Sequence, residues 1–193
     1  MAMVICEAVL KSSSPISFSA PIQSEKMTGE TGDAFEQRTW RERLHVNELG
    51  NVFIPPNALK NCLSEVAKYL AEPIKGKGKS TYTKHFEAGL MVMDPIDLGI
   101  KGDSVAGERL FVPADGKRGG GKRVWRTFPI VPEWRATARL YLLDQVLIDS
   151  PDKVREYLEQ AGKFIGLGRF RPRNNGWYGR FTVEKWTAKK AEN

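Results

Sequence analysis

The spacing of apolar positions divides the first half of the chain into a strand and a helix. Residues 3–11 are apolar and rich in β-branched side chains, which is typical of a strand. Further on, apolar side chains recur at positions 59, 62, 63, 66, 67 and 70, which is the spacing of a helix with one buried stripe. We expect this helix to have Asn57 as its N-cap and to stop at Pro73.

A strand and a helix follow one another again in the second half of the chain. Residues 134–147 alternate between apolar and polar positions, as expected for a half-buried strand. The apolar positions of this strand are Trp134, Ala136, Ala138, Leu140 and Leu142. A second helix then opens with Ser150 as its N-cap and Pro151 at its first position, and Gly162 can end it.

The remaining segments have weaker patterns. Residues 12–50 are polar with few apolar anchors, and we interpret them as a long arm with a hairpin or short helix around Phe35–Leu44. Residues 85–99 suggest a strand that ends at Asp94–Pro95. Residues 103–133 have two strand-like flanks around a tract of glycine and basic residues, which predicts a hairpin with a basic tip.

The order of these elements predicts an α+β fold. Without its insertions the chain follows the order β-α-β-β-α-β, which is the ferredoxin-like arrangement also used by RNA-recognition (RRM-like) modules. We expect a single domain over residues 1–193. Its insertions are the arm at about 12–50, basic loops at about 75–84 and 114–126, and a glycine-rich loop at 163–180.

The composition favours a polyanionic partner. Lysine and arginine number 30 and aspartate and glutamate 23, and the resulting charge of +7 is typical of proteins that bind nucleic acid. Two cysteines and two histidines are too few for a disulfide framework or a zinc centre, so we predict no metal and no cofactor. The N-terminus has no basic segment before a short apolar run, and no run approaches the roughly 18 apolar residues of a spanning helix. We therefore expect a cytoplasmic protein without a membrane partner.

The glycine-rich loop carries the strongest chemical signal. Between residues 163 and 183 glycine, basic and aromatic residues are interleaved and no acidic residue occurs. Glycine lets backbone amides approach a phosphate, basic side chains neutralise it, and aromatic rings stack on bases. Neither the P-loop nor the dinucleotide motif is present. The candidate nucleic-acid-binding residues here are Lys163, Arg169, Arg171, Arg173, Trp177, Tyr178 and Arg180, with Lys122 and Arg123 in the second basic loop.

No catalytic group of residues stands out in the sequence. His45 and His85 have no evident carboxylate partner and are interpreted as structural or surface residues. Asp33 follows Gly32 in the arm segment TGETGDAF and is typical of a turn. The pair Asp94 and Asp97 is explained by the turn around Pro95. We assign no catalytic residue.

Two motifs resemble those of the RAMP superfamily, the ferredoxin-fold RNA-binding proteins of CRISPR systems. The first is VFIPPNALKNCLSEVAKYL, in which Ile54, Pro55, Leu59 and Lys60 match the signature at the first helix of effector-backbone subunits. The second is IGLGRFRPRNNGWYGRFTV, similar to the C-terminal glycine-rich loop of the family, with one extra residue between its closing glycines.

The resemblance implies a subunit that coats RNA. In such proteins the segment after the first strand acts as an arm that reaches a neighbouring subunit, and the turn before the first helix and the glycine-rich loop contact the RNA backbone. Lys60 joins the candidate phosphate contacts on this basis. The implied partners are single-stranded RNA, with single-stranded DNA as the alternative, further copies of the chain in a head-to-tail assembly, and other CRISPR-type subunits.

Two other functions stay open at this stage. The first is an endoribonuclease of the same fold that uses Asp33 with a metal ion, or His85 as a base. The second is an inhibitor that docks onto a CRISPR complex by mimicking a subunit. Tight protein binding with weak affinity for free nucleic acid would distinguish the inhibitor.

Overall fold

The computed structural model describes residues 3–116, 119 and 121–191. Its strands are β1 (Val4–Ser12), β2 (Ile16–Ser17), β3 (Asn51–Ile54), β4 (Leu90–Met91), β5 (Ile96–Lys101), β6 (Ala106–Pro113), β7 (Arg123–Val131), β8 (Arg135–Leu142) and β9 (Phe181–Lys190). Its α-helices are α1 (Gly32–Thr39), α2 (Pro56–Leu70), α3 (Thr83–Ala88), α4 (Gln145–Ile148) and α5 (Pro151–Phe164), and short 3₁₀ turns are η1 (Trp40–Arg43), η2 (Gly102–Ser104) and η3 (Pro172–Asn174). Strands and helices are both abundant, so the α+β class is confirmed.

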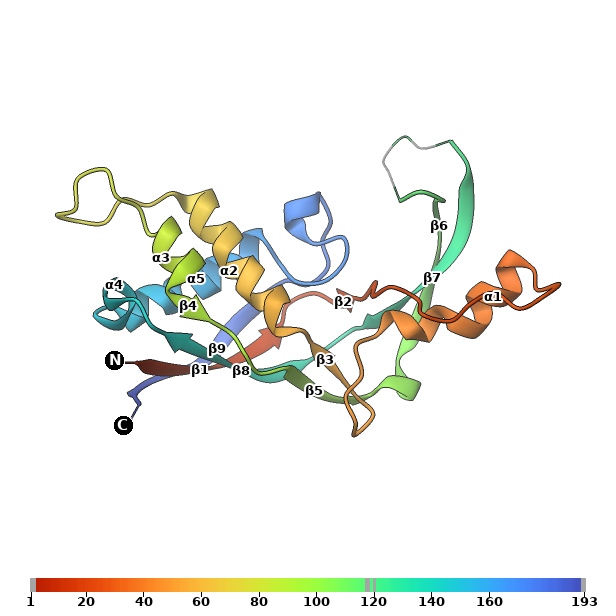
Figure 1. The fold of residues 1–193 in the computed structure, drawn as a ribbon, viewed down its shortest axis with the longest axis horizontal. Coiled ribbons are helices and arrows are strands. Elements are labelled where there is room, and N and C mark those ends of the chain that lie inside the picture. The colour runs from red at the N-terminus through yellow and green to blue at the C-terminus, as the bar shows by residue number, and fades with distance from the viewer. Residues whose placement is uncertain (1–2, 117–118, 120, 192–193) are drawn as a thin grey trace.

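The main sheet has four antiparallel strands in the order β4-β8-β1-β9. Alternate residues of β1 and β8 are buried, as the apolar pattern predicted, and they face the two long helices. Figure 1 shows α2 and α5 lying together on one side of this sheet. Exposed charged side chains such as Glu7 and Arg139 occupy the other face.

Helix α5 approaches the sheet closely at Gly162. A Cβ atom at this position would lie 2.0 Å from the carbonyl oxygen of Phe181 in β9, which only glycine avoids. The sequence analysis expected that Gly162 could end the helix. In the structure Gly162 lies inside α5, which continues to Phe164. Pro151 opens it as predicted. No helix in the described part of the chain is long and apolar enough to cross a membrane.

Helix α2 differs from the prediction at both ends. It begins at Pro56 with Pro55 in the N-cap position, because proline has a backbone angle suited to the first helical turn and lacks the N–H that would be unpaired there. Asn57 therefore lies inside the helix and is not its cap. The helix ends at Leu70, since Ala71 adopts the left-handed conformation before Pro73 is reached.

The strand predicted over residues 85–99 is wrong in its first half. His85 belongs to helix α3, a two-residue strand β4 follows, and the longer strand β5 starts only after Pro95. Buried Phe86 and Leu90 supply the apolar pattern that suggested a continuous strand. The strand predicted over 134–147 also stops early, at Leu142, because α4 begins shortly afterwards.

The arm and the β6–β7 hairpin form a second lobe beside the main sheet (Figure 1). The hairpin was predicted correctly, although residues 117, 118 and 120 of its basic tip lie outside the described residues. The short helix predicted in the arm is confirmed by α1 and η1. Strand β2 pairs with β7 and so connects the arm to the hairpin. This pairing sets the distance between the second lobe and the glycine-rich loop.

Candidate nucleic-acid interface

The glycine-rich loop is fixed to the start of the arm by backbone hydrogen bonds. The N–H of Arg169 donates to the oxygen of Ser17 at 2.8 Å, and the N–H of Gly179 donates to the oxygen of Pro15 at 2.7 Å. Within the loop, the N–H of Leu167 donates to the oxygen of Gly179 at 3.0 Å. The side chains of the loop are therefore held in place by the backbone and by the buried Leu167.

Two glycines are required for this loop to close. A Cβ atom at Gly176 would lie 1.6 Å from the oxygen of Phe170, and one at Gly179 would lie 1.8 Å from the oxygen of Leu167. Gly179 also has a φ of +73°, which L side chains rarely adopt. The glycine spacing noted in the sequence is thus a packing requirement of the loop.

Gly179→Ala should destabilise the loop more than the backbone angle alone explains. Gly50 has a φ of +76° with nothing near its Cβ position, so Gly50→Ala carries only the conformational cost, about 1 kcal/mol. The contact with Leu167 should add about 1–3 kcal/mol at Gly179. Urea unfolding of both variants measures this difference. Equal losses in the two variants would show that the loop can relax around the extra methyl group.

The second lobe is held together by a buried carboxylate. Glu36 of α1 is only 3% exposed and forms ion pairs with Arg43 at 2.9 Å and with Arg126 of β7 at 3.0 Å. The backbone N–H of Thr127 also donates to Glu36, at 2.7 Å. Burial raises the pKa of Glu36, but these donors outweigh burial and hold the pKa below its ordinary value. Glu36 thereby fixes the arm on the hairpin and positions the two arginines.

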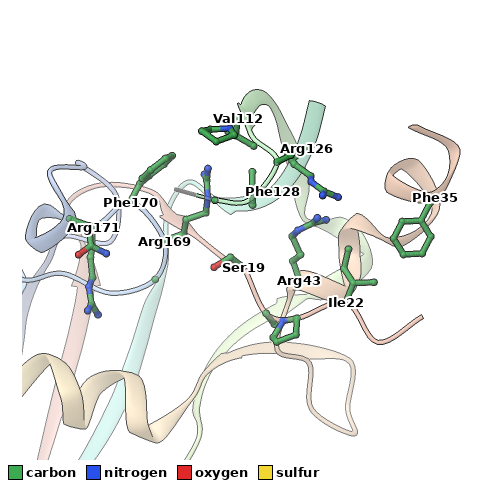
Figure 2. A pocket seen from close by; sticks show the side chains of 17 residues that line it. Ser19, Ile22, Phe35, Arg43, Val112, Arg126, Phe128, Arg169, Phe170 and Arg171 are labelled. Atoms are coloured by element: carbon green, nitrogen blue, oxygen red, sulfur yellow. The ribbon is translucent and has the colours of Figure 1, made fainter. Parts of the chain in front are cut away.

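A groove of about 960 Å³ lies between the glycine-rich loop and the second lobe. Arginines reach it from three segments, the arm, the hairpin and the loop. Among the described residues that line it none is acidic, and Glu36 pairs with Arg43 and Arg126 outside the lining. Figure 2 shows these side chains arranged around the groove. The arginines are Arg43, Arg126, Arg169 and Arg171, and the aromatic residues are Phe35, Phe128 and Phe170. The combination of several cations with aromatic rings suits a polyanion that carries bases.

Arg169 is the central cation of the groove. Its guanidinium lies 3.4 Å from the ring centroid of Phe128 and 3.9 Å from that of Phe170 (Figure 2). Within the described part of the chain, Arg169 forms no ion pair with a carboxylate, and its buried Nη1 has no hydrogen-bond partner. Burial lowers the pKa of Arg169 to about 10, so the group stays charged at neutral pH. A partly buried cation of this kind attracts an anion into the groove.

Arg171 points the other way, toward α2 (Figure 2). Its guanidinium lies 3.1 Å from a carboxylate oxygen of Glu65, which joins the glycine-rich loop to the helix. Arg169 and Arg171 therefore differ in role. Arg169 presents its charge to the groove, whereas the charge of Arg171 is partly neutralised.

Lys60, Tyr178 and Arg180, three more of the predicted binding residues, also have partners inside the protein. The ammonium of Lys60 donates to the carbonyl oxygens of Phe86 and Glu87 and stabilises the end of α3. Tyr178 is buried, and its hydroxyl donates to a carboxylate oxygen of Glu108 at 2.7 Å. Arg180 donates to the carbonyl oxygen of Lys163 at the end of α5. These interactions give the three side chains structural roles.

The other predicted residues are exposed around the groove or on the hairpin. Trp177 is 56% exposed, and Lys163 and Arg173 also lie at the surface of the loop region. Lys122 and Arg123 are exposed on the hairpin, where Arg123 donates to the oxygen of Phe111 at 2.7 Å. Of the predicted set, only Arg169 and Arg171 line the groove. The remainder stay predictions as contacts to a longer ligand.

The groove residues on the arm and on the hairpin were not predicted from the sequence. Arg43 and Phe35 belong to the polar arm, and Arg126 and Phe128 follow the basic tip of the hairpin. The basic character of the hairpin was the one signal in the sequence, and it pointed to the tip rather than to the strand behind it. No local pattern distinguishes Arg43 from the other arginines of the arm.

The residues considered for catalysis are engaged in contacts away from the groove. Asp33 forms an ion pair with Arg109 at 2.7 Å. His85 Nδ1 lies 2.9 Å from a carboxylate oxygen of Asp144, a partner that the sequence did not reveal. Asp144 also accepts from the N–H of Val146 and caps α4. The pair therefore connects α3 to α4, at the far end of the molecule from α1 (Figure 1).

Comparisons with known proteins identify the fold. No protein-family model and no curated protein matches the chain. Among solved structures, it is similar to a chain in the cryo-EM structure of the type III-B Cmr-beta bound to cognate target RNA, with 11% identity and a TM-score of 0.53. The match covers 99% of this chain and 62% of that one, so this chain spans less than two thirds of its length.

A second solved structure matches over nearly its whole length. The crystal structure of Cmr6 from Pyrococcus furiosus has a TM-score of 0.52 and 14% identity, and the match covers 95% of this chain and 99% of that one. At such low identity the likeness concerns the fold. The chain therefore shares its fold with these two structures, which agrees with the fold that its two motifs implied.

Proposed function

We propose that the chain binds single-stranded RNA in the groove between the glycine-rich loop and the second lobe. The observation that carries this proposal is the guanidinium of Arg169, which lies between two aromatic rings without an ion pair to a described carboxylate. Phosphates would contact Arg169, with Arg126 at the side of the groove. Bases would stack on the exposed ring of Phe170.

A single strand suits this site better than a duplex. The groove lies between the glycine-rich loop and the second lobe. Its aromatic rings can stack only on bases that are not paired in a double helix. The open face of the main sheet is the face that binds RNA in RNA-recognition modules. Among the described residues, this face carries ion pairs such as Glu7–Arg139 and no exposed aromatic ring. We therefore place the ligand in the groove and not on the sheet.

We infer a non-catalytic role within a CRISPR-type ribonucleoprotein. The sheet order β4-β8-β1-β9, with α2 and α5 as the two connecting helices, supports a ferredoxin-like core. One structure with a similar fold contains Cmr-beta with target RNA. Other CRISPR-type subunits and target or guide RNA are the partners that this likeness suggests.

Head-to-tail assembly is a further part of the proposal. The second lobe extends beyond the main sheet (Figure 1), and its hairpin exposes the neighbouring rings of Phe111 and Trp125, whose centroids lie 5.2 Å apart. Burial of these rings against the next copy would stabilise the contact. Because such a contact joins different surfaces of two copies, it can repeat along an RNA strand.

Size-exclusion chromatography with light scattering tests this function. We expect the purified protein to elute as a large species with the ultraviolet spectrum of bound nucleic acid. RNase should collapse this species, and DNase should leave it intact. Collapse by DNase alone would assign the groove to single-stranded DNA. A monomer without nucleic acid, and without affinity for added RNA, would contradict the proposal.

A further inference from the structure

A second, smaller cavity opens beside the groove. It has a volume of about 310 Å³ and lies between the start of the arm, the start of α2 and the glycine-rich loop. The groove and the cavity share five lining residues, so the two are adjacent. The shared residues are Ser19, Ala20, Pro21, Gly168 and Arg171.

The lining of this cavity is largely apolar. Phe18, Ile54 and Pro55 contribute apolar surface, and the imidazole of His45 lies at one side, its ring packed against Phe53 with a centroid distance of 5.7 Å. A lining of this kind suits a planar ring that is removed from water. Aromatic and imidazole side chains are the groups on which unpaired bases stack. A volume of this size leaves room for one purine.

Arg171 is the charged side chain among the described residues that line the cavity, and the polar side chains of Ser19 and His45 can each donate and accept. Arg171 enters from the glycine-rich loop. Its Nη2 lies 3.1 Å from Glu65, and its Nε has no hydrogen-bond partner within the described structure. The guanidinium also points toward this side of the loop, away from Arg169 (Figure 2). The arginine side chain has only hydrogen-bond donors, and it can form a bidentate hydrogen bond to the O6 and N7 acceptors of guanine. Adenine presents a donor at the equivalent position of O6 and fits less well.

We propose that this cavity receives one base of the bound strand and favours guanine. The inference rests on the proposed RNA binding in the groove, since the strand must pass the entrance of the cavity for a base to turn into it. Phosphate contacts in the groove hold the strand, and the cavity adds preference for a base. The chain would then bind any single strand, with higher affinity where a guanine can enter the cavity.

Fluorescence anisotropy with single-stranded oligouridylate tests the cavity. One internal nucleotide is varied between uridine, guanosine, adenosine and an abasic residue. Because phosphate binding tolerates any sequence, the strand can slide until the varied base meets the cavity. We expect the guanosine strand to bind about fivefold or more tightly than the uridine and abasic strands, with the adenosine strand weaker than guanosine.

Ala58→Phe is the variant that separates the cavity from the groove. Ala58 lines the cavity at the start of α2 and does not line the groove. The larger side chain should fill the space, abolish the guanosine preference and leave affinity for oligouridylate within about twofold. His45→Ala, which opens one wall instead, should also reduce the preference.

The two proposals can fail separately. If no strand binds the wild-type protein, RNA binding in the groove is wrong and the cavity loses its ligand. If all strands bind with equal affinity, including the abasic one, only the cavity proposal is overturned. Guanosine preference that persists in Ala58→Phe would place base recognition elsewhere.

Discussion

Arg169→Ala is expected to lower the affinity for single-stranded RNA about tenfold or more. The variant removes a charged donor that is held between Phe128 and Phe170 and that has no described carboxylate partner. A hydrogen bond to a charged group contributes about 1.5–3 kcal/mol, which corresponds to this loss. Fluorescence anisotropy at several salt concentrations measures the affinity, and the salt slope should fall by about 0.7 for each phosphate of the single strand that Arg169 neutralises.

Two further variants make the result specific to the groove. Arg155→Ala removes the same charge from the exposed face of α5, where the guanidinium pairs with Glu159, and it should bind RNA almost as well as the wild type. Arg169→Lys keeps the charge but loses the planar group that packs between the rings, so it should recover only part of the affinity. Equal losses in the alanine variants of Arg169 and Arg155 would mean that net charge, and not the groove, binds the strand.

Glu36→Ala is expected to lower the free energy of unfolding by about 3–5 kcal/mol. Without the carboxylate, the guanidinium of Arg43, which is 7% exposed, remains buried without its ion-pair partner. The arm would then lose one of its attachments to the hairpin, and one wall of the groove would be less firmly held. Urea unfolding measures the effect, and Glu156→Ala is the control because its pair with Lys153 is exposed and should contribute less than about 1 kcal/mol. A loss that matches the control would show that Glu36 does not hold the lobe.

The same carboxylate makes stability depend on pH. Glu36 has a folded-state pKa below its ordinary value of 4.5, so the native state binds fewer protons than the unfolded state in this range. Its contribution is complete above pH 4.5 and is lost as the pH falls through the folded-state pKa. Between neutral pH and acid, the wild type should therefore lose more stability than Glu36→Ala. Parallel pH profiles for the two proteins would contradict this assignment.

The elements with a strong local pattern were predicted from the sequence. The alternation of β8 and the apolar stripes of α2 and α5 identified their buried faces, and these faces enclose the core. The glycine-rich loop was also identified, because the close approach of backbone segments at Gly176 and Gly179 requires glycine. Local sequence determined these features, so local reasoning could find them.

The features that failed depend on contacts between distant segments. Helix α3 replaced a predicted strand, and its end is stabilised by Lys60 from another helix. His85 meets Asp144 across 59 residues of sequence, and Glu36 of the arm meets Arg126 across 90. The groove arises from the same kind of pairing, which is why only its glycine-loop side was predicted.

Photo-crosslinking of the wild-type protein to single-stranded RNA that contains 4-thiouridine tests the central claim most directly. Mass spectrometry of the linked peptides reports where the bases lie. Binding in the groove predicts crosslinks to the segments that carry Phe128 and Phe170, and their loss in Arg169→Ala. Crosslinks concentrated on the open face of the main sheet, around Arg139 and Tyr141, would contradict the account.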